Sequence, residues 1–110
     1  AYQRAQASEI LNSVYGDSGG DAVYKALFKP GVFGSKPLIV LTHGAYDASD
    51  PIEAMDQAAM TRLHRETARL SRNGIQRTVE GSSHNIEIDR PAAIVEAIEE
   101  VEARLVAQRR

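Results

Sequence analysis

Apolar and polar positions along the chain predict helices that alternate with two short strands. The strongest strand signal is the continuous apolar run from Pro37 to Thr42, which is followed by Gly44. Such a run is typical of a central parallel strand that is covered on both faces. A second, shorter strand is expected over residues 75–79, and its more polar pattern places it nearer a sheet edge.

The segment between the two strands carries the signals of a helix. Asp50, Pro51 and Glu53 have the spacing of an N-cap, a first-turn proline and a capping box. Asn73-Gly74 predicts a left-handed stop at the other end. The positions expected to form the apolar stripe of this helix are Met55, Ala59, Leu63 and Leu70.

The remaining segments complete an α/β pattern. A last amphipathic helix is expected to begin at Asp89-Arg90-Pro91, with a solvated acidic face. Before the first strand, we expect helical residues over 2–14, a glycine-rich break over 15–21, a short helix over 22–28 and a loop over 29–36. Two strands joined by one helix form a parallel pair. The apolar face of the last helix consists of Ile94, Ala97, Ile98, Val101 and Leu105.

Composition narrows the classes of function. A chain of 110 residues corresponds to one domain, and its net charge of −2 provides no basic surface for nucleic acid. The absence of cysteine excludes disulfides and thiolate metal sites and favours a cytoplasmic location. No apolar run has the length of a membrane span, so no membrane partner is expected.

Topology directs attention to two loops. Parallel strands end at the same edge of a sheet, where open α/β sheets bind their ligands. The loops over 43–50 and 81–85 should therefore meet, with Asp47 on the first and His84 on the second. A histidine accepts a proton near neutral pH, and a carboxylate on its other ring nitrogen orients it and stabilises the imidazolium.

The two loops also carry a resemblance to a known family. Gly44-Ala45-Tyr46-Asp47, with Pro51 after it, resembles the acid loop of α/β-hydrolases, and Glu80-Gly81-Ser82-Ser83-His84-Asn85-Ile86 resembles their histidine loop. The likeness spans Pro37 to the C-terminus. It implies the C-terminal βαβα part of a parallel, doubly wound hydrolase sheet, with residues 1–36 as the end of a lid or helical region. It further implies Asp47 as the triad acid and His84 as the base of an esterase-like enzyme.

The nucleophile of such a triad is not evident in this chain. Gly16-Asp17-Ser18-Gly19-Gly20 matches the usual Gly-x-Ser-x-Gly motif, and Ser18, Asp47 and His84 follow the family's order. However, no β-branched strand precedes Ser18, and a glycine-rich turn explains the motif. Because the chain begins at Ala1 and two strands seldom form a stable sheet, we expect the C-terminal portion of a longer hydrolase. An N-terminal segment or a second chain would then supply the nucleophile.

Several alternatives stay open at this stage. Asp50 competes with Asp47 as the acid, but its N-cap position already explains it. His43 either lines the site, together with Tyr46, or serves in packing, and His64 is interpreted as a surface residue. No spacing suits a metal, and no cofactor is expected. The expected substrate is a small ester; an aspartate nucleophile would instead give dehalogenation or epoxide opening, and the rival interpretation is a non-catalytic α/β interaction module.

Overall fold

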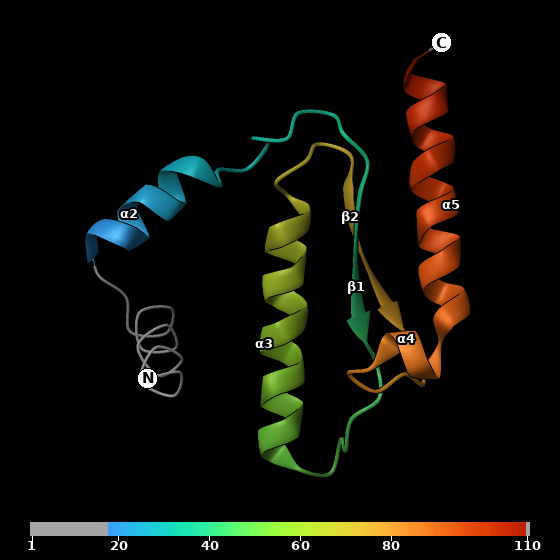
Figure 1. Cartoon of the computed structure of the whole chain (residues 1–110). Coiled ribbons are helices and arrows are strands. Elements are labelled where there is room, and N and C mark those ends of the chain that lie inside the picture. Colours follow the sequence, from blue (N-terminus) through green and yellow to red (C-terminus); the bar gives the residue numbers. More distant parts are fainter. Residues whose placement is uncertain (1–17, 110) are drawn as a thin grey trace, which may run out of the picture.

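The computed structural model describes residues 18–109 of the chain as a mixed α/β structure (Figure 1). The chain order is helix, strand, helix, strand and two helices. The elements are α2 (Ser18–Leu27), β1 (Leu38–His43), α3 (Pro51–Ala68), β2 (Gly74–Val79), α4 (Ile86–Asp89) and α5 (Pro91–Gln108).

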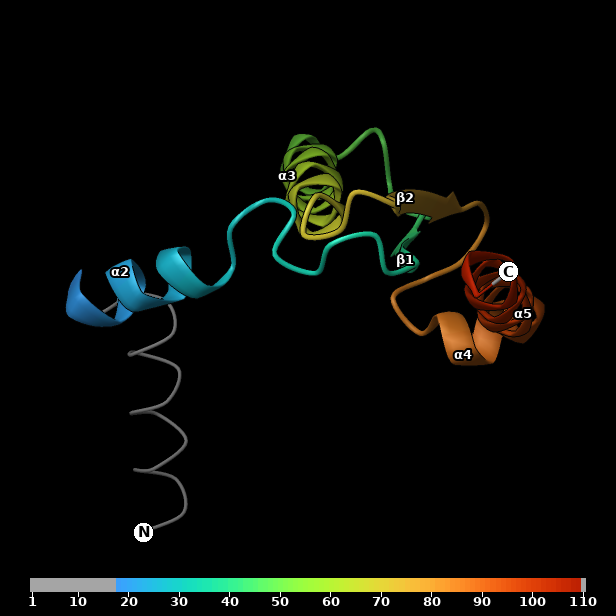
Figure 2. The same ribbon diagram turned by 90° about the horizontal axis from the view of Figure 1, so that it is seen from above.

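The sheet of the described residues consists of β1 and β2, which are parallel as expected. The register runs from Leu38 opposite Gly74 to His43 opposite Val79. Helix α3 packs against one face and α5 against the other (Figure 2). Both strands therefore end at the edge from which the 44–50 and 80–85 loops leave.

The beginning of α3 confirms the expected cap. The Asp50 side chain accepts a hydrogen bond from the backbone N–H of Ile52 at 2.9 Å, and Pro51 is the first helical residue. The reciprocal arm of a capping box is not formed, because the Asp50 N–H donates to the carbonyl of Asp47 instead of to Glu53.

The face that α3 buries differs from the predicted one. Met55 and Leu63 are 73% and 55% exposed, so the predicted apolar stripe was wrong. The buried positions are Gln57 and Ala68, with half-buried His64 between them on the same face. The reason is that the side chains of Gln57 and His64 form hydrogen bonds with residues of β1, which makes their burial favourable.

The turn after α3 also corrects the prediction. The helix ends at Ala68, and Gly74 is the first residue of β2 rather than a left-handed stop. Positive φ angles occur instead at Gly31, Gly34 and Gly81. Gly74 is required by a close approach, because a Cβ atom built there would lie 1.7 Å from the carbonyl oxygen of Ala68.

Of the elements predicted before the first strand, the structure confirms a short helix but places its start earlier. Residues 1–17, including the expected helix over 2–14, lie outside the described residues. The predicted break over 15–21 was wrong at its end, because α2 already begins at Ser18. The side chains from Val23 to Phe28 are exposed.

The core of the described residues is small and leaves the first strand incompletely covered. Its buried apolar side chains are those of Ala68, Val79 and Ala97. The expectation of a strand covered on both faces was wrong for these residues, because only Thr42 of β1 is buried and the remaining positions are intermediate. The edge of β1 away from β2 pairs with no described strand.

The C-terminal helices are α4 and α5. Helix α4 was not predicted, and α5 begins at Pro91 after Arg90. Its expected apolar face meets β1, although Ile98 remains 60% exposed. Within residues 18–109, no helix combines the length and the apolar character needed to cross a membrane.

Candidate active site

The two loops expected to meet do lie together at the carboxyl edge of the sheet. The N–H of Gly44 donates to the carbonyl of Val79, and the N–H of Ala45 donates to that of Ser82, each at 2.9 Å. Gly44 permits this approach, because a Cβ atom there would lie 2.9 Å from the Val79 oxygen. The acid loop and the histidine loop are thus joined through their backbones.

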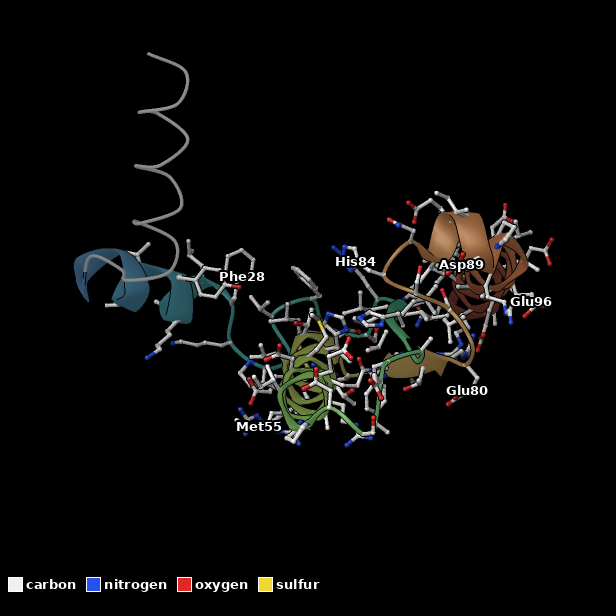
Figure 3. All side chains as sticks on the ribbon, turned by 90° about the horizontal axis from the view of Figure 1, so that it is seen from below. Phe28, Met55, Glu80, His84, Asp89 and Glu96 are labelled. Carbon is white, nitrogen blue, oxygen red and sulfur yellow. The ribbon has the colours of Figure 1, made fainter. Side chains whose placement is uncertain are left out.

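His84 occupies an exposed position on the second loop. The loop turns at Gly81, whose φ of 76° favours glycine, and then passes through Ser82, which is fully buried. The Ser82 hydroxyl donates to the Ser83 carbonyl at 2.8 Å. The His84 side chain projects from this loop, away from α5 (Figure 3). The buried Ser82 therefore fixes the loop, and the imidazole of His84 two residues later is exposed.

His43, the last residue of β1, lies beside His84. The two rings form an edge-to-face contact with centroids 5.9 Å apart and an interplanar angle of 83°. The Nδ1 atom of His43 is buried and has no hydrogen-bond partner among the described residues. The backbone carbonyl of His43 accepts a hydrogen bond from the Gln57 side chain at 2.6 Å. The ring also lines a pocket of about 150 Å³, together with Ala45, Tyr46, Glu53, Asp56, Gln57 and Met60. His43 thus combines packing with a place beside the predicted base.

Asp47 lies on the loop next to His84 but is bonded elsewhere. Its carboxylate accepts hydrogen bonds from Ser49, from the hydroxyl at 2.6 Å and from the N–H at 3.0 Å. These bonds favour the ionised form and lower the pKa of Asp47. Within residues 18–109 the described hydrogen bonds of its carboxylate come from Ser49, so Asp47 lies on the neighbouring loop without a bond to His84.

Another carboxylate, which was not predicted as a site residue, supports the histidine loop. The carboxylate of Asp89 accepts the N–H of Ser83, the residue before His84, at 2.7 Å. Hydrogen bonds from the Ser83 hydroxyl and N–H lower the pKa of Asp89. Asp89 was interpreted as part of a helix start, but it is the last residue of α4. The Ser83 to Asp89 spacing carried no signal that would have identified the contact.

The other sequence candidates occupy different parts of the structure. Ser18 begins α2, which lies on the opposite side of α3 from α4 in both views (Figures 1 and 2). The interpretation of His64 as a surface residue was wrong. Its Nδ1 lies 2.7 Å from the hydroxyl of Thr42, which is fully buried and also accepts from Gln76 at 2.9 Å. His64 therefore belongs to a polar network between α3 and the sheet.

The described residues offer no evident metal site. No group of three or more His, Cys, Asp or Glu side chains that could hold a metal ion occurs among them. An imidazole near carboxylates, as at this edge, can accept and donate protons near neutral pH.

Comparison of the chain with models of protein families, with curated proteins and with solved structures yields no match in any of the three. The α/β-hydrolase resemblance accordingly depends on the loop residues and their arrangement alone.

Proposed function

We propose that this chain supplies the acid and the base of a nucleophile–histidine–acid hydrolase that acts on small esters. The observation that carries the proposal is the junction of the two strand-end loops, with Ala45 bonded to Ser82 at 2.9 Å. This junction presents His84 at the carboxyl edge of a parallel sheet, beside the loop that carries Asp47. A base and an acid on adjacent loops of this edge suit a triad.

In the proposed reaction, His84 accepts the proton of an attacking hydroxyl and returns it to the departing alcohol. It then activates the water that releases the acyl group. Asp47 orients the imidazole through its other ring nitrogen and stabilises the imidazolium. Because Ser49 holds the Asp47 carboxylate in the described structure, a rearrangement of the 47–49 turn precedes this contact. An aspartate nucleophile would direct the same pair to dehalogenation or epoxide opening.

We assign the nucleophile to a segment before this chain or to a second polypeptide. Supporting this assignment, the outer edge of β1 is unpaired among the described residues, and a groove of about 480 Å³ lies between β1 and α5. An added parallel strand would use the free N–H and C=O groups of β1 and cover its apolar side chains. The two strands would then be the last of a doubly wound hydrolase sheet. The groove is lined by Ile39, Leu41, Ile94, Ala97, Ile98, Val101, Glu102 and Leu105.

The test is ester turnover by the assembly that contains this chain, compared with that of the His84→Ala assembly. Loss of the base should reduce turnover by about a thousandfold or more. The matched control is Asn85→Ala, which truncates the adjacent exposed side chain and should leave turnover within about twofold of the parent. Equal turnover of the parent and His84→Ala assemblies would refute the proposal.

One observation favours a second candidate function, a non-catalytic interaction module. Asp47 is bonded to Ser49 rather than to His84, as in an ordinary turn. Native mass spectrometry separates the two candidates. A co-purifying polypeptide with a Gly-x-Ser-x-Gly motif supports the hydrolase, whereas a stable, inactive homodimer of this chain supports the module.

A further inference from the structure

A second site candidate lies at the opposite edge of the sheet from His84. The loop over 29–36, the C-terminal turn of α3 and the beginning of β2 surround a cleft of about 780 Å³. Its lining residues include three arginines, Arg65, Arg69 and Arg72, and no aspartate or glutamate. The other lining residues are Pro30, Gly31, Ala68, Ser71, Gly74 and Gln76.

The positive charge of this cleft is not neutralised by the described part of the chain. The ion pairs found there join Arg77 and Arg104 to Glu100, and none involves the three cleft arginines. Arg65 lies in the last turn of α3, and Arg69 is the residue that caps the helix four positions later, so two like charges lie close together there. In a chain whose net charge is −2, this concentration of cations is local. A concave surface lined by one sign of charge focuses the field on a counter-ion.

The backbone behind the arginines is held in place. The N–H of Gly31 donates to the Arg69 carbonyl at 2.8 Å, and the N–H of Arg72 donates to the Gly34 carbonyl at 2.7 Å. Ser71 is 3% exposed and donates to carbonyls of the same loop. The loop and the helix end therefore form one hydrogen-bonded unit, so that binding need not first order the backbone.

We infer that this cleft binds a phosphoryl group carried by a small molecule. Guanidinium groups present a planar fork of donors that matches two phosphate oxygens, and several of them around one anion give charge-assisted bonds. Three cations suit one multivalent phosphoryl group better than the long phosphate backbone of a nucleic acid. The volume of about 780 Å³ leaves room for the remainder of a small ligand. The site lies at the other end of α3 from His43 and does not depend on the proposed hydrolase activity.

The experiment is titration of the 110-residue chain with pyrophosphate, followed by the NMR shifts of the Gly31 and Gly74 amides. Parallel arms use inorganic phosphate and glycerol phosphate, which distinguish a free anion from a phosphomonoester with the same recognition chemistry. We expect saturable shifts at these amides and little change at Gly81, which lies on the histidine loop.

Variants separate the cleft from general charge effects. Arg65→Gln and Arg69→Gln should each weaken pyrophosphate binding by about tenfold. Arg104→Gln removes the same charge from α5, outside the cleft, and should change the affinity by about twofold at most. Equal weakening by all three variants, the absence of saturable shifts, or binding to anionic vesicles or duplex DNA without binding to pyrophosphate would each overturn the inference. Circular dichroism of each variant measures whether its helix content equals that of the parent.

Discussion

The two edges of the sheet are constructed differently. At the amino edge, buried Ser71 joins the end of α3 to the 29–36 loop, and the side chains of Asn73 and Gln108 both donate to the Ser35 carbonyl, at 2.8 and 2.6 Å. At the carboxyl edge, His84 and Asp47 are exposed, and the buried Nδ1 of His43 has no partner. The amino edge bonds its uncharged polar side chains internally, whereas the carboxyl edge leaves His84 and Asp47 exposed.

Within one βαβ unit, the amino edge therefore contributes mainly to stability, and the carboxyl edge carries the groups that could react. A buried polar group that forms its hydrogen bonds stabilises the fold, whereas an unpaired one costs free energy. We therefore expect substitutions of the uncharged residues at the amino edge to act mainly on stability. Substitutions at the carboxyl edge should act mainly on reactivity.

The largest expected effect on stability is at the amino edge, in Gly74→Ala. Its new Cβ would lie 1.7 Å from the carbonyl oxygen of Ala68, so the turn between α3 and β2 must shift. We expect a loss of about 3 kcal/mol or more in the free energy of unfolding, measured by urea denaturation. The matched variant at the carboxyl edge is Gly44→Ala, whose Cβ would lie 2.9 Å from the Val79 oxygen, and its expected loss is about 1–2 kcal/mol. An equal loss in both variants would contradict the difference between the edges.

A smaller effect distinguishes the two aspartates of the first loop. Asp50→Ala removes the N-cap of α3 and should lower the free energy of unfolding by about 1 kcal/mol. Asp47→Ala removes only an exposed turn contact to Ser49, so a loss within about 0.5 kcal/mol is expected. In ester turnover the order should reverse, with Asp47→Ala the more impaired. Greater loss of turnover in Asp50→Ala would transfer the acid role to Asp50.

The smallest expected effect is the pH dependence contributed by Asp89. Because its pKa is lowered in the folded chain by Ser83, it stabilises the fold above the pKa of the unfolded chain. That stabilisation is lost as pH falls through the folded pKa. Asp89→Asn should therefore flatten the decrease of the urea midpoint on the acid side.

Glu87→Gln is the control for that measurement. It neutralises another exposed carboxylate of α4, which accepts no hydrogen bond from a described residue, and should leave the slope close to that of the parent. An acid limb that is unchanged in Asp89→Asn would show that the Ser83 contact contributes nothing measurable.

Sequence reasoning succeeded where the signal was local. The continuous apolar run predicted β1, and the Asp50-Pro51 pair predicted the start of α3, because an apolar β-branched run and a helix cap are properties of neighbouring residues. Reasoning failed where polar residues were buried. An apolar stripe through Met55 and Leu63 was predicted, but the buried face carries Gln57 and His64, whose partners on β1 are far away in sequence.

For the candidate site, the position of the loops was predicted from the sequence, but most of the contacts within it were not. Parallel topology was sufficient to bring the loops of Asp47 and His84 to one edge, because the strands of a βαβ unit end together. The bond from Ser49 to Asp47 is a local turn contact between residues two positions apart. The support of the histidine loop by Asp89 and the contact between His43 and His84 had no signal in the sequence. Each depends on the loop conformation that the packed sheet imposes.

By itself, the sequence therefore determined the two strands, the helix cap and the edge at which His84 lies, since these follow from local periodicity and chain connectivity. Only the tertiary structure decided that the Asp89 carboxylate accepts a hydrogen bond from Ser83 and which face of α3 is buried. It also decided that Arg65, Arg69 and Arg72 share one cleft. The physical reason is that the contacts of α3 with β1 and of the turn after α3 with the 29–36 loop join residues distant in the sequence, which only folding brings together.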